Sequence, residues 1–210
     1  MARPWQHGPT VDAQLEQLRG RVDNQSARSD ALRAMADAAG ALANLHALGW
    51  AHGDLRPQHI VHTPRGVALL NLAWAHNPSV KLRPEHDLPY PGPLVHCRTP
   101  GTARRLLAGD TITPTPTDDV YALAAIWWHS LTDTWPTNYQ AAGLKPEPDD
   151  SLAVQRAVAS EQWRHQIELI EWRAVSAPLR AALSAQSQDR PTARDLADQL
   201  GRLVAQGADE

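Results

Sequence analysis

Hydrophobic residues recur at helical spacing along most of this chain. The clearest stretch ends just before Gly49 and places six apolar residues on one face: Leu32, Met35, Ala39, Leu42, Leu45 and Leu48. Residues three and four apart share a face of an α-helix, so this spacing predicts a helix with one buried side, and glycine commonly ends such a helix. A shorter helix is predicted before it, with Val11, Leu15 and Leu18 on one face and Thr10 as its N-cap.

The pattern changes after this helix. Two short strand-like runs, residues 59–62 and 67–72, flank the turn sequence Thr63-Pro64-Arg65-Gly66. Apolar runs of this length around a Pro/Gly turn predict a β-hairpin. Residues 77–116 then contain many prolines and little periodicity, which predicts a long irregular loop. A loop of that length in a compact domain usually carries a function.

The second half of the chain is helical again. Residues 120–131, which follow Asp118 and Asp119, are apolar nearly all round, and a helix of this kind lies at the centre of a core. Further helical patterns cover residues 152–159, 163–175 and 178–185. The whole pattern predicts a mainly α fold with one or two small β-hairpins.

The last predicted helix has the clearest boundary. It begins at Pro191-Thr192 and runs to about Ala205, because Thr192 and Asp195 have the spacing of a capping box. Residues 207–210 are expected to form a frayed tail.

Composition narrows the class of protein. The chain has 210 residues, enough for one domain, and its hydrophobic share of 42% excludes wholesale disorder. A net charge of −3 argues against a nucleic-acid or membrane-surface binder. The lone Cys97 excludes an intramolecular disulfide and a multi-cysteine zinc site. No leader-like or membrane-spanning run is present, so we expect a soluble, cytoplasmic protein.

One segment without periodicity carries the candidate chemistry. The sequence HGDLRPQH, residues 52–59, lies between the predicted buried helix and the hairpin. A carboxylate and a guanidinium two residues apart, Asp54 and Arg56, have the chemistry of a base and a phosphate clamp. The alternative interpretation is a plain loop closed by a local ion pair.

This segment resembles a known family. HGDLRPQH is similar to the H-R-D-x-K-x-x-N catalytic loop of protein kinases, and more so to the H-G-D variant of kinase-like small-molecule phosphotransferases. Further segments resemble kinase segments in the same order: LANLHALGWAHGDLRP the helix before the loop, VALLNLAWA the strand ending in D-F-G, Gly101 to Gly109 the end of the activation segment, TDDVYAL the start of the central helix, and QDRPT the start of a late helix. Residues 5–204 thus resemble the large, helical lobe of a protein kinase.

The resemblance implies a domain organisation. Residues 1–28 would be a hinge-like segment and a short helix, and residues 29–206 the kinase-like lobe. The small lobe is missing, since no glycine-rich loop and no strand lysine precede the helix predicted to begin at Ser29. The glutamate that usually pairs with the arginine at Arg190 has no clear equivalent.

The resemblance also implies roles for single residues. Asp54 would be the catalytic base, Arg56 a phosphate contact, and Thr102 a brace for that pair, if the protein is active. His52 and Asp119 would hold the catalytic loop, with Asp119 accepting hydrogen bonds from its backbone.

The metal positions depart from the family's pattern. The D-F-G aspartate falls on Asn71 and the catalytic-loop asparagine on His59. Mg²⁺ prefers anionic oxygen ligands, and imidazole suits zinc or copper better. We therefore expect no cofactor for the chain alone, and ATP with Mg²⁺ only where another chain supplies a small lobe.

Three functions are compatible with these residues. The first is a pseudokinase module that binds a partner protein, a peptide or a second copy of itself, with Trp5 and Trp74 on the face that a small lobe would cover. The second is a phosphotransferase acting on a hydroxyl of a peptide or small metabolite and completed in trans. The third is a decayed gene product whose fold persists. Residues 1–28 folding back over the exposed face is the alternative to a partner.

Overall fold

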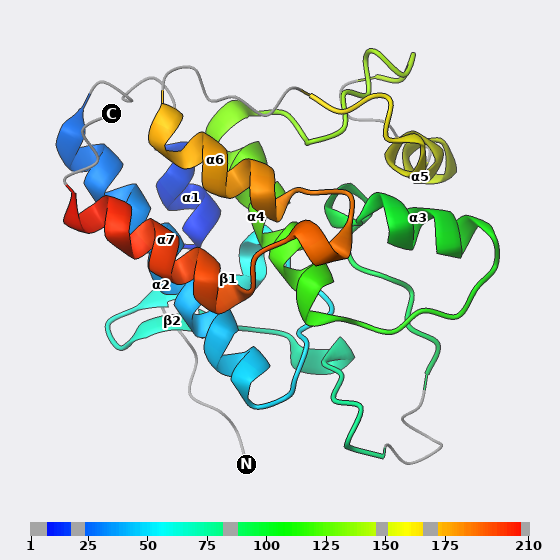
Figure 1. Cartoon of the computed structure of the whole chain (residues 1–210), viewed down its shortest axis with the longest axis horizontal. Helices are drawn as coiled ribbons and strands as arrows, with labels where there is room; N and C mark the ends of the chain where they lie inside the picture. Colours follow the sequence, from blue (N-terminus) through cyan, green and yellow to red (C-terminus); the bar gives the residue numbers. More distant parts are fainter. Residues whose placement is uncertain (1–7, 18–23, 82–87, 146–150, 166–171, 207–210) are drawn as a thin grey trace.

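The computed structural model describes residues 8–17, 24–81, 88–145, 151–165 and 172–206. Within these ranges the protein is mainly helical, with one two-stranded antiparallel sheet (Figure 1). The helices are α1 (Val11–Glu16), α2 (Gln25–Ala47), α3 (Pro100–Leu107), α4 (Pro116–Thr132), α5 (Ser151–Ser160), α6 (Arg173–Ala182) and α7 (Ala193–Ala205). The strands are β1 (Ile60–Thr63) and β2 (Gly66–Leu69).

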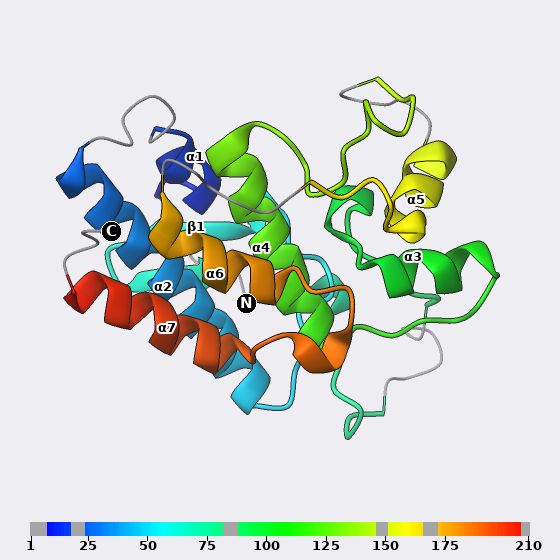
Figure 2. The ribbon, with the colours of Figure 1, turned by 45° about the horizontal axis from the view of Figure 1, so that its top comes forward.

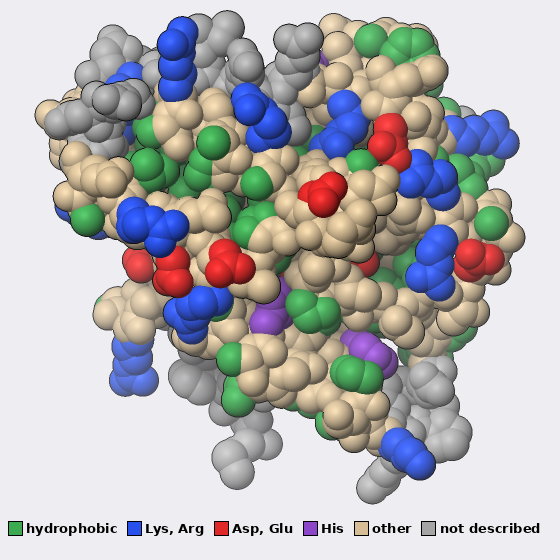
Figure 3. All heavy atoms as spheres, viewed as in Figure 1, with side chains coloured by type: hydrophobic (Ala, Val, Ile, Leu, Met, Phe, Trp, Pro, Cys, Tyr) green, Lys and Arg blue, Asp and Glu red, His purple; other side chains and the backbone are tan. Residues whose placement is uncertain are grey.

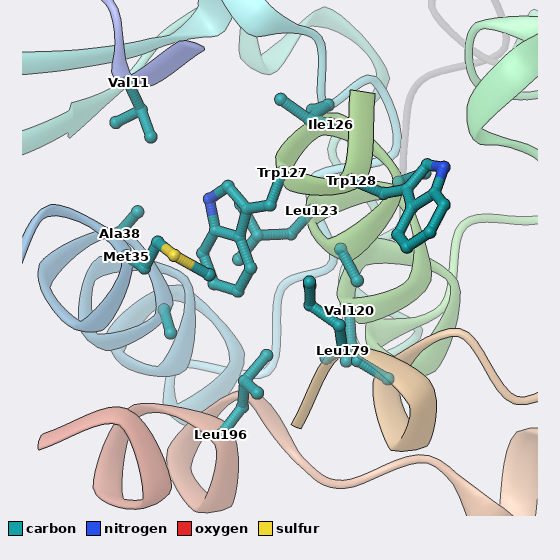
Figure 4. Close-up of a cluster of buried hydrophobic side chains, with 14 of the residues drawn as sticks. Val11, Met35, Ala38, Val120, Leu123, Ile126, Trp127, Trp128, Leu179 and Leu196 are labelled. Atoms are coloured by element: carbon teal, nitrogen blue, oxygen red, sulfur yellow. The ribbon is translucent and has the colours of Figure 1, made fainter. Parts of the chain in front are cut away.

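Helix α4 is the centre of the core, as its all-round apolar sequence predicts. Every residue from Asp119 to Trp128 is buried. Figure 4 shows Trp127 reaching from α4 toward Met35 of α2, with Leu179 of α6 and Leu196 of α7 nearby. Helices α2 and α7 lie side by side in both views of the ribbon (Figures 1 and 2).

The N-terminal part belongs to the same core. Val11 and Leu15 of α1 are fully buried against it. Helix α2 begins at Gln25, four residues before the predicted start, because the Asn24 side chain caps it by accepting a hydrogen bond from Ala27 N at 3.2 Å. The predicted boundary between residues 28 and 29 therefore falls inside a helix. Leu18 and the expected tail at 207–210 lie outside the described residues.

The residues before α1 pair with the hairpin. Thr10 makes no side-chain cap bond, contrary to the prediction, and its backbone instead forms an antiparallel bridge with Val61. The Pro9 carbonyl accepts a hydrogen bond from His62 N at 2.9 Å. The N-terminal segment thus covers the outer edge of β1.

The hairpin forms where the sequence predicts it. Its register pairs Ile60 with Leu69 and Val61 with Ala68. The second strand ends earlier than the predicted run, after Leu69, because Asn71 takes the left-handed backbone conformation (φ 58°).

Three sequence predictions of secondary structure were wrong. The proline-rich stretch 77–116 contains helix α3, because Pro100 is at its first turn, where proline fits a helix, and Thr99 caps it by accepting from Thr102 N at 3.0 Å. Residues 163–165 are not helical, since the chain there bridges back to Thr137. Pro178 does not begin a helix but lies inside α6.

The prediction for α7 is confirmed. Thr192 and Asp195 form a reciprocal capping box, in which the Thr192 hydroxyl accepts from Asp195 N at 3.1 Å and the Asp195 carboxylate accepts from Thr192 N at 3.2 Å.

Candidate functional site

The loop of residues 52–56 is held by one buried carboxylate. Asp119, in the first turn of α4, accepts hydrogen bonds from His52 N at 2.6 Å, Gly53 N at 2.9 Å and the His46 ring at 3.0 Å. Gly53 has φ +81°, and a Cβ there would lie 2.6 Å from the Trp74 carbonyl oxygen. Only glycine fits this backbone, and Asp119 accepts the N–H groups of both His52 and Gly53.

The His52 ring ties the loop to the end of the hairpin. Its Nε2 lies 2.9 Å from the Leu70 carbonyl oxygen, and its Nδ1 accepts from Asp54 N at 3.2 Å. Because a carbonyl can only accept, Nε2 carries the proton and Nδ1 is the acceptor. Burial lowers the pKa of His52. The ring of His52 thus links the loop to the residue that follows β2.

Four residues then meet around one carboxylate, and we call them the Asp54 cluster: Asp54, Arg56, His59 and Asn71. Asp54 is buried, and its Oδ1 accepts from Arg56 Nε at 2.7 Å. Its Oδ2 accepts from Asn71 Nδ2 at 3.1 Å. The Asp54 carbonyl oxygen lies 2.7 Å from His59 Nδ1, so that nitrogen carries the proton, and His59 Nε2 faces Asn71 Nδ2 at 3.4 Å.

The residues of the Asp54 cluster do not fit a magnesium ion. Both oxygens of the carboxylate already accept hydrogen bonds, one of them from a guanidinium. His59 and Asn71 add no anionic oxygen, which is the ligand that Mg²⁺ prefers. Among the described residues, no group of three or more His, Cys, Asp or Glu side chains is arranged to hold a metal ion.

Thr102 is not where the resemblance places it. Its hydroxyl accepts from Thr99 Oγ1 at 3.0 Å and donates to Asp118 Oδ2 at 3.5 Å. The expected brace of the Asp54–Arg56 pair is therefore replaced by a link between α3 and α4, because the first turn of α3 directs this side chain toward Asp118.

The acidic partner of Arg190, which the sequence analysis did not identify, is Asp118. Its guanidinium, buried in the protein, donates to Asp118 Oδ1 at 3.2 Å. It also donates to three carbonyl oxygens, those of Thr117, Ser184 and Ala185, at 2.8–3.0 Å. Asp118 is thus a structural residue that the motifs did not reveal.

Trp5 and Trp74 were both expected on the face that a small lobe would cover, and the structure describes only Trp74. Trp5 lies outside the described residues. Trp74 is half-buried and packs against Tyr90, with ring centroids 5.9 Å apart. The Tyr90 hydroxyl donates to the Gly53 carbonyl, and burial raises its pKa. Tyr90 comes from the proline-rich stretch, and no sequence pattern pointed to it.

Among the described residues, the exposed apolar side chains that directly follow Asn71 of the Asp54 cluster are Leu72, which is 42% exposed, and Ala73. Leu48, at the end of α2, is 73% exposed.

Comparison with known proteins identifies no relative: neither a family model nor a curated protein matches this chain.

The surface in Figure 3 carries acidic and basic side chains mixed together, with no large basic patch on that face. None of the helices in the described ranges is long and apolar enough to cross a membrane.

Proposed function

We propose that this protein is a kinase-like large lobe that works as a binding module without phosphotransfer, and that it docks a partner protein chain or peptide. The observation that carries the proposal is the set of side chains around Asp54, since Arg56, His59 and Asn71 add no second anionic oxygen for a metal ion. Each oxygen of the Asp54 carboxylate already accepts a hydrogen bond, from Arg56 at 2.7 Å and from Asn71 at 3.1 Å.

A catalytic base must accept the proton of a substrate hydroxyl. A hydroxyl arriving at Asp54 would share the carboxylate with a guanidinium and an amide that are already in place. Phosphotransfer also needs metal ions that bridge the phosphates, and the side chains around Asp54 do not fit magnesium. The metal requirement of the reaction is therefore poorly met.

The arrangement of the elements supports the kinase-like assignment. A helix that is buried all round, α4, carries the aspartate that holds the loop backbone. The hairpin β1–β2 follows the loop directly, and α3 precedes α4. These are the positions that the sequence resemblance implies for the large lobe.

A phosphotransferase completed in trans is the second candidate. The Asp54–Arg56 pair favours it, because the pair is intact and the Arg56 side chain is 38% exposed to an incoming group.

Thermal shift and phosphate transfer separate the two candidates. We expect ATP with Mg²⁺ or Mn²⁺ to leave the melting temperature of the purified chain unchanged, since only a ligand that binds the folded state raises its stability. We also expect no transfer of radiolabelled γ-phosphate. A turnover of about 1 s⁻¹, typical of slow kinases, that is lost in Asp54→Asn would overturn the proposal.

A further inference from the structure

A groove of about 740 Å³ lies between the hairpin and two helices. Its walls come from α2, from β2 with the preceding turn, and from α7; we call it the α2–β2 groove. Leu45, Leu48 and Leu72 are among the residues that line it; Leu48 and Leu72 are exposed, and Leu72 directly follows Asn71 of the Asp54 cluster. The groove therefore continues the open face of the proposed binding module.

One wall of the groove is an unpaired sheet edge. Leu70 N donates to the His59 carbonyl at 2.8 Å, which sets the alternation of the ladder. In this register Ala68 exchanges hydrogen bonds with β1, so the N–H and C=O groups of Val67 and Leu69 point away from it. Among the described residues neither has another backbone partner. The far edge of β1 is already paired with Thr10.

The opposite wall leaves room beside this edge. Gly40 lies in the middle of α2, where glycine is unfavourable for a helix, and a Cβ there would meet no atom within 4 Å. No internal contact requires glycine at this position. Ala36 and Ala41 also line the groove, so three of the residues that α2 contributes to this wall are small.

The charges at the groove favour an acidic occupant. Arg65 lies in the turn before β2 and Arg194 on α7, while Asp37 is the one acidic residue among those that line it. Two positive charges and one negative charge leave an excess of one positive charge. Arg194 donates to the Asn44 side chain, a neutral partner, at 3.0 Å.

We propose that the α2–β2 groove binds an extended peptide segment of a partner protein by strand addition to β2. The segment pairs its backbone with Val67 and Leu69, places alternate apolar side chains against Gly40 and the leucines, and carries an acidic residue facing Arg194. Strand addition supplies affinity through main-chain hydrogen bonds and specificity through alternate side chains. The inference rests on the proposed function and names the class of partner.

Panning a phage library of random nonapeptides on the full chain tests this. We expect enriched sequences with alternating apolar residues and at least one Asp or Glu. The enriched peptide, labelled with a dye, is then measured by fluorescence anisotropy. Gly40→Leu fills the groove and should weaken binding by about tenfold or more, while the matched Gly201→Leu, on an exposed face of α7 with open space around it, should change it less than about twofold.

Further variants separate the backbone and charge contributions. Val67→Pro removes an outward N–H, which an edge strand tolerates, and should weaken binding more than Val67→Ala. Arg194→Glu should weaken binding of the acidic peptide, whereas Arg202→Glu on the same helix should not. Melting temperatures near that of the wild type confirm that each variant is folded.

Several results would overturn the proposal that the α2–β2 groove binds a peptide. These are no enriched peptide, an enriched peptide whose binding is unchanged by Gly40→Leu, or a wild-type dimer that Gly40→Leu converts to a monomer, since the occupant would then be a second copy. None of these results bears on phosphotransfer. The ATP experiment on the same protein therefore tests the binding-module proposal separately.

Discussion

Asp118 and Asp119 are neighbours in the sequence, but their side chains hold different parts of the molecule. Asp119 is buried and accepts the backbone N–H groups of the loop, while the Asp118 side chain is 25% exposed and pairs with Arg190. The difference follows from the helix, because consecutive residues lie about 100° apart around its axis.

We predict that Asp119→Ala destabilises the protein more than Asp118→Ala. The first change strands two buried N–H donors, at about 1–3 kcal/mol each. The second leaves Arg190 with three carbonyl acceptors. Urea denaturation of both variants measures the free energies of unfolding. Equal losses would show that the Asp118–Arg190 pair contributes as much to the free energy of unfolding as the hydrogen bonds between Asp119 and the loop.

A second prediction concerns the loss of folding stability in acid, which involves His96. His96 stacks on Trp135 with ring centroids 4.7 Å apart, and its Nδ1 lies 2.7 Å from the Tyr139 hydroxyl. Burial, with His129 and Arg98 nearby, lowers the pKa of His96 to about 4. As pH falls, the His96 ring therefore binds a proton in the unfolded state before it does so in the folded state. The contribution of the neutral ring to folding stability is complete above pH 6.5 and is lost as pH falls toward 4.

Urea midpoints measured from pH 7.5 to pH 4.5 check this contribution. The wild type should lose stability across the window, and burial lowers the pKa of His52, His62 and His165 in the same direction. His96→Phe keeps an aromatic ring against Trp135 and should lose less stability over the same window. An identical slope in both proteins would contradict the prediction.

At the scale of elements, the loop passes close to the short helix η2 (Leu72–Trp74) at Gly53. A Cβ on Gly53 would lie 2.6 Å from the Trp74 carbonyl oxygen, and the Gly53 N–H donates to Asp119 at 2.9 Å. The residues next to this approach, Asp54 in the loop and Asn71 before η2, are joined by a hydrogen bond.

Gly53→Ala tests this contact, with Gly109→Ala as its control. Both glycines have φ +81°, so each alanine carries the same backbone strain, about 1–2 kcal/mol. Only at position 53 would the new Cβ also meet backbone at 2.6 Å. We expect Gly53→Ala to lower the melting temperature clearly further than Gly109→Ala. Similar shifts would mean that the loop can move away from η2 at little cost.

At the scale of the whole molecule, most of the buried hydrophobic residues in the described ranges fall into two clusters of unequal size. The main one joins α1, α2, α4, α6 and α7 around Trp127. The smaller one packs α5 against α3 and Tyr139, and its buried members are mostly alanine and valine. Less apolar area is therefore buried around α3 and α5.

Hydrogen exchange should reveal this division. Local opening costs less where fewer apolar contacts are broken, so amides of α3 and α5 should exchange faster than those of α2 and α4. Mass-spectrometric exchange on the native chain at neutral pH measures each segment. Uniform protection of all these helices would indicate that the two clusters open only together.

The sequence by itself determined the local features of this protein. The apolar stripe of α2, the all-round apolar α4, the hairpin turn and the capping box of α7 each depend on residues a few positions apart, whose geometry is set by the period of the element. The motif also predicts loop-holding roles for His52 and Asp119, both of which are hydrogen-bonded within or to the loop. The kinase-like identity remains a prediction from that motif.

The tertiary structure decided the pairings between distant residues. Asp118 meets Arg190 across 72 positions, and Tyr90 reaches Gly53 across 37. Thr102 pairs with Asp118 in place of the cluster around Asp54 because α3 forms inside a stretch whose prolines predicted a loop. Such contacts depend on how packed helices bring their ends together, and no short-range pattern of residue types records that arrangement.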